Sequence, residues 1–224
     1  MVDEYLSERE QAEQFRLWLR ENWIWLVTGV ALVVGGYYGN RWWESRQASR
    51  ALAAEARFSA MLDALSGNKR EEGVRIGTEV TGEFAGTPYA DQAELMLARL
   101  DAEAGEFAKA ERRLARVAGE SDDPELALVA RLRLARVQLA QGEHGQALAT
   151  LDAAQQPVIE PRIEELRGDV QLARGERSAA LASYRRAQAA ASSETAAAGL
   201  LDTELLAMKI DQLAATPAPA PATE

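Results

Sequence analysis

Few side chains in this sequence could do covalent or acid–base chemistry. The 224 residues include no cysteine and a single histidine, His144. A catalytic thiolate, a disulfide and a thiolate metal site are therefore excluded, and a Ser-His-Asp triad would have to use His144. This histidine lies between a Gly-Glu pair and Gly145, which predicts a residue in a surface turn. Phosphate-binding loops, zinc-ligand spacings and EF-hand patterns are absent from the sequence, which thus predicts no catalytic residue, no metal site and no cofactor.

Acidic side chains are abundant but carry little information about a site. The chain has 35 Asp and Glu against 25 Lys and Arg, a formal net charge of -10. In a helix-rich acidic protein such carboxylates are typical of solvated helix faces, and they are not clustered in one loop. The negative balance argues against nucleic acid as the main partner.

The more informative polar residues occur at equivalent places in successive copies of a repeat. Arg99, Arg136 and Asp169 occupy one such position, on what should be the first helix of each helical pair. If the pairs stack, their first helices line a concave surface, which predicts a peptide groove that could read an extended backbone or acidic groups. The alternative is that these are ordinary solvated charges. The candidate groove residues are Gln92, Arg99, Glu103, Val129, Leu132, Arg136, Arg162, Glu165 and Asp169.

The repeat is visible from Tyr89 onward. A Gly-Glu pair recurs at Gly105, Gly142 and Gly175, with spacings of 37 and 33 residues. Glycine suits the place where the first helix of a pair stops, because it accepts a left-handed backbone. The pattern predicts one helical hairpin per period. Further matched positions are Ala110, Ala147 and Ala180, then Leu114, Leu151 and Tyr184, and the proline breaks Pro124 and Pro161.

Each matched position has a physical meaning. The small alanine lets the second helix approach the first closely, and the Leu or Tyr is expected to fill the space between hairpins. A single hairpin cannot bury its apolar stripe alone, so the hairpins must stack and the stack needs a cap. Residues Thr195 to Leu213 are predicted to form this cap, with Leu201, Leu205 and Met208 as its apolar stripe. Its polar residues Asp202, Glu204 and Lys209 are expected to face solvent.

Two more helices are expected before the repeats. Apolar residues at helical spacing predict one helix that ends near Ser66-Gly67-Asn68 and a second that continues to about Ala85. Gly86-Thr87-Pro88 then breaks the chain, with threonine and proline in places that often start a helix. At the other end of the sequence, the Pro- and Ala-rich stretch TPAPAPATE is expected to be disordered.

An apolar stretch near the N-terminus, from Trp23 to Trp43, is long enough to cross a bilayer. The nineteen residues between Glu21 and Arg41 carry no charge and would span about 28 Å as a helix. Aromatic residues lie at both ends, where amphipathic rings favour the headgroup level. A buried core helix and a cleaved signal peptide are the alternatives. The acidic leader and the bulky GYYGNRWW that follows the apolar run argue against cleavage.

The sequence therefore predicts an all-α protein: a single N-terminal transmembrane helix followed by an α-solenoid of stacked helical hairpins with a C-terminal capping helix. The expected divisions are an acidic leader at 1–21, the transmembrane helix at 22–43, the repeat domain at 44–214 and a disordered tail at 215–224. Arginines are nearly balanced on the two flanks of the span, so charge alone does not determine its orientation.

The whole pattern resembles a known family. The matched small residues resemble those of tetratricopeptide repeats, and the third copy has Gly168, Gly175, Ala180, Tyr184 and Ala187 in the familiar places. The first two copies differ in having Ala98 and Ala135 where the early glycine would be. With the acidic leader, the span and the segments YADQAELMLARL, ELALVARLRLARVQLAQGE and ELRGDVQLARGERSAALASYRRA, the chain is similar to the YfgM family. These are bacterial inner-membrane tetratricopeptide proteins known as ancillary subunits of the SecYEG translocon.

The resemblance implies a single-pass protein of the bacterial inner membrane, with its N-terminus in the cytoplasm and its repeats in the periplasm. It implies a non-enzymatic scaffold whose partners are the SecYEG translocon, a membrane-anchored periplasmic prolyl isomerase-like chaperone and exported chains. Two alternatives stay open at this point. One is a membrane-anchored tetratricopeptide assembly factor for another envelope pathway, such as cytochrome c maturation, and the other is an enzyme with an unrecognised carboxylate site.

Overall fold

The computed structural model describes residues 8–154, 156–192 and 201–215, and every regular element within them is helical. The chain divides by its internal contacts into two units, Met1–Leu52 and Ala53–Glu224, and the division falls inside the first helix. The predicted all-α fold is therefore confirmed. The helices are α1 (Glu8–Ser66), α2 (Arg70–Glu83), α3 (Pro88–Glu103), α4 (Phe107–Glu120), α5 (Pro124–Ala140), α6 (His144–Asp152), the short 3-10 helix η1 (Pro157–Ile159), α7 (Glu160–Ala173), α8 (Arg177–Ala191) and α9 (Thr203–Ala215).

In the first unit, α1 carries the apolar stretch. Among the described residues this is the one helix long and apolar enough to cross a membrane, and its most apolar part has no buried residue. Leu32 and Val33 are each 72% exposed, and the aromatic residues at the rims are also exposed. In water such a surface would be costly, because it leaves large aliphatic side chains without apolar neighbours. A lipid environment removes that cost. The predicted boundaries at 21/22 and 43/44 both lie within this continuous helix and stay predictions.

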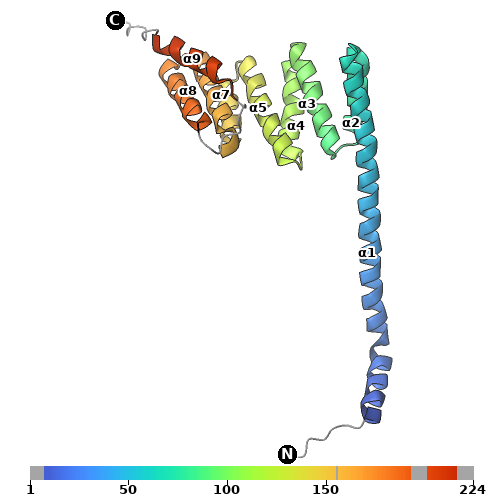
Figure 1. Ribbon diagram of the computed structural model, residues 1–224. Helices are drawn as coiled ribbons and strands as arrows, with labels where there is room; N and C mark the ends of the chain where they lie inside the picture. The colour runs from blue at the N-terminus through green and yellow to red at the C-terminus, as the bar shows by residue number, and fades with distance from the viewer. Residues whose placement is uncertain (1–7, 155, 193–200, 216–224) are drawn as a thin grey trace, which may run out of the picture. The chain divides into compact units, whose positions relative to one another are not determined.

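In the second unit the helices form consecutive hairpins that stack in chain order (Figure 1). The pairs α3/α4, α5/α6 and α7/α8 are the three predicted hairpins, and the first helices also contact one another from α3 to α5 and from α5 to α7. The end of α1 and the helix α2 come before them and share a core cluster with α3. The predicted solenoid is confirmed.

The turns form as the sequence predicts. Gly105, Gly142 and Gly175 each follow the first helix of a hairpin with φ between +78° and +80°, a region that favours glycine. Thr87 caps α3 by accepting a hydrogen bond from the backbone N–H of Ala90, and Pro88 occupies the first turn. α1 ends at Ser66, as expected.

Close approach of the two helices is most demanding in the third hairpin. A methyl group at Gly168 would lie 2.4 Å from the ring of Tyr184, which is fully buried. In the first two hairpins the equivalent pairs are Ala98 with Leu114 and Ala135 with Leu151, and each pair shares one core cluster. The departure from the tetratricopeptide pattern noted at Ala98 and Ala135 thus accompanies the smaller leucine opposite.

The capping helix α9 packs differently from its predicted stripe. Leu201 lies against the core cluster as expected, but Leu205 and Met208 are 42% and 56% exposed. Leu206 and Leu213 are buried instead, with Ile210 beside them. The prediction for Leu205 and Met208 is wrong because both stripes have helical spacing, and contacts with α8 select the second. Asp202 accepts a hydrogen bond from the N–H of Leu205. Part of the expected cap and residues 216–224 of the expected tail lie outside the described residues.

Gly168→Ala should destabilise the third hairpin by about 1–2 kcal/mol, because the overpacking against Tyr184 outweighs the better helix propensity of alanine. The free energy of unfolding of the detergent-solubilised protein, followed by circular dichroism in urea, checks this.

Two further variants make the test specific. Gly82→Ala, on α2 with open space around it, should be neutral or stabilising by up to about 1 kcal/mol. Adding Tyr184→Leu to Gly168→Ala should recover part of the loss by recreating the Ala–Leu pair of the other hairpins. Equal effects of Gly168→Ala and Gly82→Ala would contradict the close-contact explanation.

Candidate functional site

The predicted groove residues lie on α3, α5 and α7, the first helices of the three hairpins; their common surface is called the first-helix face below. Their exposure differs. Arg99, Glu103 and Arg136 are exposed, whereas the others are half-buried or, for Glu165, buried. Val129 and Leu132 pack against two of the core clusters, so both serve the fold as well as the surface. The Gln92 side chain is half-buried on α3 and forms no hydrogen bond with another described residue.

The acidic residues of this face are held by local ion pairs. Arg99 Nε lies 2.8 Å from Glu103 Oε1 on the next turn of α3. On α7, Arg162 Nη1 lies 3.1 Å from Glu165 Oε2. Ion pairs between exposed side chains one turn apart contribute little to stability, but they fix the directions of the side chains.

Lys209 of α9 reaches this face as well, although the sequence predicted that it would face solvent. Its Nζ lies 3.1 Å from Glu165 Oε1 and 2.8 Å from Asp169 Oδ1, and Tyr184 donates a hydrogen bond of 2.7 Å to the same oxygen of Asp169. The prediction for Lys209 is wrong because buried Glu165 and half-buried Asp169 attract its ammonium group across the domain. These contacts join α9 to α7.

The electrostatics of Lys209 and Tyr184 follow from these contacts. Burial alone would lower the pKa of Lys209, but its hydrogen bonds and charge interactions with Asp169 and Glu165 raise the pKa overall. Burial and the hydrogen bond to Asp169 raise the pKa of Tyr184 far above its usual value. At neutral pH the lysine is therefore a cation and the tyrosine a neutral donor.

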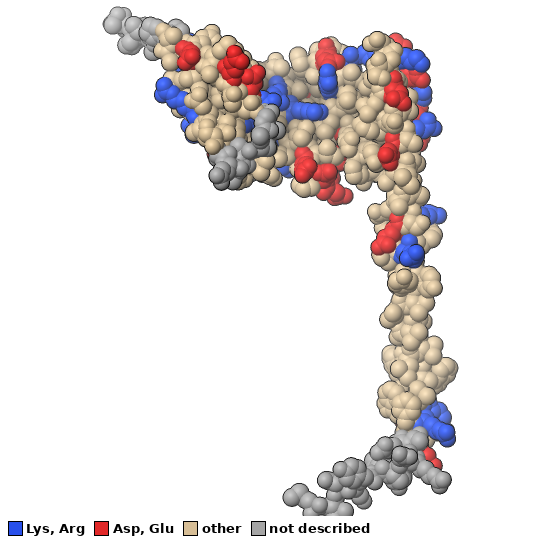
Figure 2. Space-filling view, in the orientation of Figure 1, with Lys and Arg blue, Asp and Glu red and all other residues tan. Residues whose placement is uncertain are grey.

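Arginine side chains make the middle of the first-helix face basic. Partial desolvation by neighbouring side chains lowers the pKa of Arg136, although its side chain is exposed, and the nearby charge of Arg162 lowers it further, while Glu165 and Asp169 act in the opposite direction. Arg133, one turn earlier on α5, also has its pKa lowered by partial desolvation and by the charge of Arg99. The sequence comparison of the repeats missed Arg133, because the equivalent positions of the other copies hold the apolar residues Met96 and Leu166. Figure 2 shows basic side chains gathered over α5.

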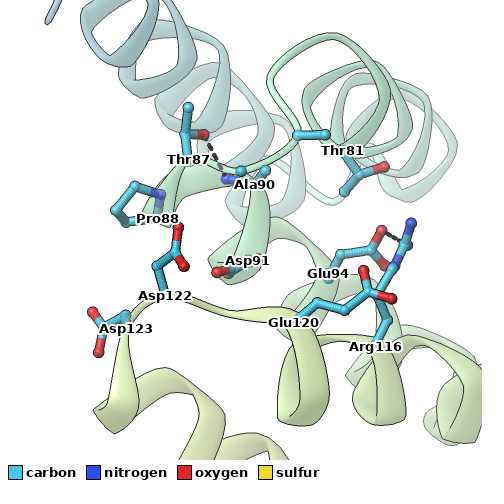
Figure 3. Close-up of a pocket in the computed structure, with 12 residues that line it drawn as sticks. Thr81, Thr87, Pro88, Ala90, Asp91, Glu94, Arg116, Glu120, Asp122 and Asp123 are labelled. Carbon is cyan, nitrogen blue, oxygen red and sulfur yellow. Dashed lines mark hydrogen bonds and ion pairs between the residues drawn. The ribbon is translucent and has the colours of Figure 1, made fainter. Parts of the chain in front are cut away.

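A second candidate site lies at the N-terminal ends of α3 and α5. There the α2–α3 and α4–α5 turns meet in a pocket of about 200 Å³ (Figure 3). Ser121 donates a 2.5 Å hydrogen bond to Asp91, and Asp123 caps α5 by accepting from the N–H of Glu125. Glu94 pairs with Arg116. These acids cap helices and join turns, and no three His, Asp or Glu side chains of the described residues are placed to hold a metal ion.

His144 is the first residue of α6 and is half-buried there. It starts a helix that packs on α5, rather than lying free in the turn. The His144 ring forms no hydrogen bond or ion pair with another described residue, so no such contact orients it. This position offers no second group for acid–base catalysis.

Comparison with known proteins gives a consistent result. Residues 16–215 match the family described as tetratricopeptide repeat-like domain. A protein of Escherichia coli is 30% identical over 209 residues, and proteins of Haemophilus influenzae and Neisseria gonorrhoeae are each 28% identical, over 208 and 212 residues. Each alignment covers 93% of this chain and 98% of the relative, and all three relatives are named ancillary SecYEG translocon subunit.

Lys209→Met should loosen α9, because it leaves Glu165 largely buried without its cross-domain partner. Removing one member of a buried pair costs about 3–5 kcal/mol; since Glu165 keeps its pair with Arg162 and the Lys209 side chain is 25% exposed, we expect about 1–3 kcal/mol. Hydrogen exchange of the α9 amides should accelerate by the corresponding factor, about 5- to 150-fold. Lys109→Met, which removes an exposed pair with Glu106, is the matched control and should leave α9 exchange unchanged.

The same contact predicts a pH dependence. Because the pKa of Lys209 is raised in the folded protein, its contribution to stability is fully present below the unfolded pKa of about 10.4 and is lost as pH rises through the folded value. In the original protein, the protection of the α9 amides against hydrogen exchange should therefore be retained from neutral pH to about pH 10 and should fall at higher pH. A pH profile identical to that of Lys209→Met would contradict this role.

Proposed function

Because the chain belongs to the tetratricopeptide repeat-like family, and within it to the YfgM family of ancillary SecYEG translocon subunits, we propose that it works as a membrane-anchored scaffold beside the Sec translocon. It is a single-pass membrane protein with a protein-binding repeat domain. In this proposal the repeats lie in the periplasm and contact the translocon, a membrane-anchored prolyl isomerase-like chaperone and newly exported chains.

The observation that carries the proposal is the extent of the likeness. The relatives align over 93% of this chain and 98% of their own length, so the likeness covers both the apolar part of α1 and the hairpin stack. A tether and a binding surface form one working unit. Anchoring raises the effective concentration of the surface at the membrane, so even a weak contact with a membrane-bound partner can be occupied.

The proposed division of labour follows the sequence boundaries. Residues 22–43 act as the span, 1–21 as a cytoplasmic leader and 44–214 as the periplasmic repeat domain. Arg16 and Arg20 before the span are matched by Arg46 and Arg50 after it, so the two flanks differ little in positive charge. A long domain can be translocated largely regardless of its charge, which allows the proposed direction.

A non-enzymatic role agrees with the chemistry of the described residues. The charged side chains of the first-helix face form pairs with one another or lie open on a surface, and they do not converge on an enclosed site. Stacked helices with exposed polar and half-buried apolar residues suit the recognition of a polypeptide.

The orientation is tested in spheroplasts. External protease should digest the repeat domain of the full-length protein while leaving a fragment that contains the leader and span. A cytoplasmic protein serves as the control for intact membranes. Complete protection of the repeat domain with such membranes intact would reverse the proposed topology.

The partner is tested by gentle detergent solubilisation of native membranes and purification through the full-length protein. We expect translocon subunits to co-purify at least about tenfold above an unrelated single-span protein with a periplasmic domain. Replacing residues 22–43 by the span of that control protein separates the anchor from the repeats: retained co-purification assigns the contact to the repeat domain. Co-purification of another envelope complex in place of the translocon would favour the alternative of an assembly factor.

A further inference from the structure

The first-helix face has more positive charge than its own acids can balance. Glu103 is paired with Arg99 and with Arg70, and Glu165 with Arg162 and Lys209. Asp169 is held by Lys209 and by the Tyr184 hydroxyl. The three carboxylates predicted for the groove are thus already engaged and are poorly placed to bind a ligand.

Two arginines of α5 have no acidic partner among the described residues. Arg133 and Arg136 are exposed, and neither forms an ion pair or a side-chain hydrogen bond with another described residue. Since they are three residues apart on a helix, they lie on one side of it. Arg99 and Arg162 act on them from the neighbouring helices, as the lowered pKa values of Arg133 and Arg136 indicate. In this strip of four arginines, Arg99 and Arg162 are each paired with an acid of their own helix, so the unpaired positive charge lies at Arg133 and Arg136, where a bound anion would be favourable.

A pocket of about 420 Å³ with a mixed apolar and polar lining adjoins this strip. Its apolar lining comes from the end of α1 and from α3, and Arg70, Arg99 and Glu103 also line it. Arg99 therefore belongs both to the pocket and to the basic strip. The volume is in the range of pockets that hold small apolar groups. The apolar lining residues are Leu62, Leu65, Met96 and Leu100.

We propose that the first-helix face binds an extended segment of an emerging exported chain, in which one large apolar side chain enters the pocket and two carboxylates pair with Arg133 and Arg136. This inference rests on the proposed function and deepens it by giving the chemistry of the bound segment. An unfolded chain suits the face better than a folded subunit, because folded proteins bury most of their large apolar side chains. Charge complementarity favours an acidic segment.

The spacing of the segment follows from helix geometry. Neighbouring helices lie about 10 Å apart, so the pocket between α1 and α3 is about 15 Å from α5, or four to five residues of extended chain. Carboxylates two residues apart point to the same side of an extended chain. Such a pair matches two arginine side chains that are one helical turn apart.

Peptide binding to the full-length protein in mild detergent tests the proposal, with fluorescence anisotropy as the measurement. The probe is a labelled Gly/Ser-rich peptide that carries one leucine and, five residues on, a Glu-x-Glu pair; a second peptide has the reverse order. We expect saturable binding of at least one of the two. Replacing both glutamates of the binding peptide by glutamine should raise its Kd about tenfold, and replacing the leucine by serine should have a similar effect.

Variants assign the contact. R133Q/R136Q should bind the glutamate peptide about tenfold more weakly and no longer distinguish it from the glutamine peptide. R133K/R136K, which keeps the charges, should retain most of the binding and discrimination. Arg112→Gln is the matched control, since Arg112 is an exposed arginine of α4 outside this face. Higher salt should weaken the binding of the glutamate peptide more than the binding of the glutamine peptide.

Equal affinity for the glutamate and glutamine peptides, unchanged binding by R133Q/R136Q, or no binding of either probe to the original protein would overturn the proposal. Co-purification separates this result from the proposed function. If translocon subunits co-purify but the peptides do not bind as described, the assigned ligand fails and the scaffold function stands. If peptides bind as described but translocon subunits do not co-purify, the basic strip stands and the scaffold function fails.

Discussion

Each hairpin of the repeat domain depends on a small side chain of its first helix lying opposite a large one of its second. The pairs Ala98–Leu114, Ala135–Leu151 and Gly168–Tyr184 meet this requirement in two ways. Where the large residue is leucine, alanine fits, and where it is tyrosine, only glycine leaves room. The distance between the helices is set by this pair, and the stacking of hairpins follows because a closely packed hairpin still has an apolar side to bury.

The tyrosine of the third hairpin has a second consequence. Its hydroxyl donates a hydrogen bond to Asp169 Oδ1, and this carboxylate oxygen also accepts a hydrogen bond from Lys209 of the capping helix. A leucine at this position, as in the other two hairpins, could not supply the donor. The third hairpin thus differs from the others at the place where the stack ends, and its polar contact with α9 supplements the apolar contacts of Leu206 and Leu213.

The repeats could be predicted from the sequence because each of their signals is local. A left-handed turn needs glycine, a helix start favours threonine or proline, and a close helix contact needs a small residue; Gly142, Thr87 and Ala147 each meet one of these needs. The packing of α9 could not be predicted in this way. Two stripes of α9 have helical spacing, and contacts with α8 residues such as Tyr184 select the buried one, while Lys209 pairs with Glu165, 44 positions away in the sequence. Arg133 was missed for a related reason: its importance comes from Arg99 on a neighbouring helix, not from an equivalent place in the repeat.

A basic strip on a protein with a net charge of -10 is physically consistent, because net charge and local recognition act over different distances. At physiological ionic strength the Debye length is about 8 Å, so acids elsewhere on the chain hardly affect a carboxylate that touches Arg133 or Arg136. The surplus acids keep the protein soluble and repel acidic molecules at longer range. A segment held near the membrane does not need long-range attraction, since the tether supplies its encounters with the face. The arginines of the strip then act only at contact distance, where they distinguish a carboxylate from a neutral side chain.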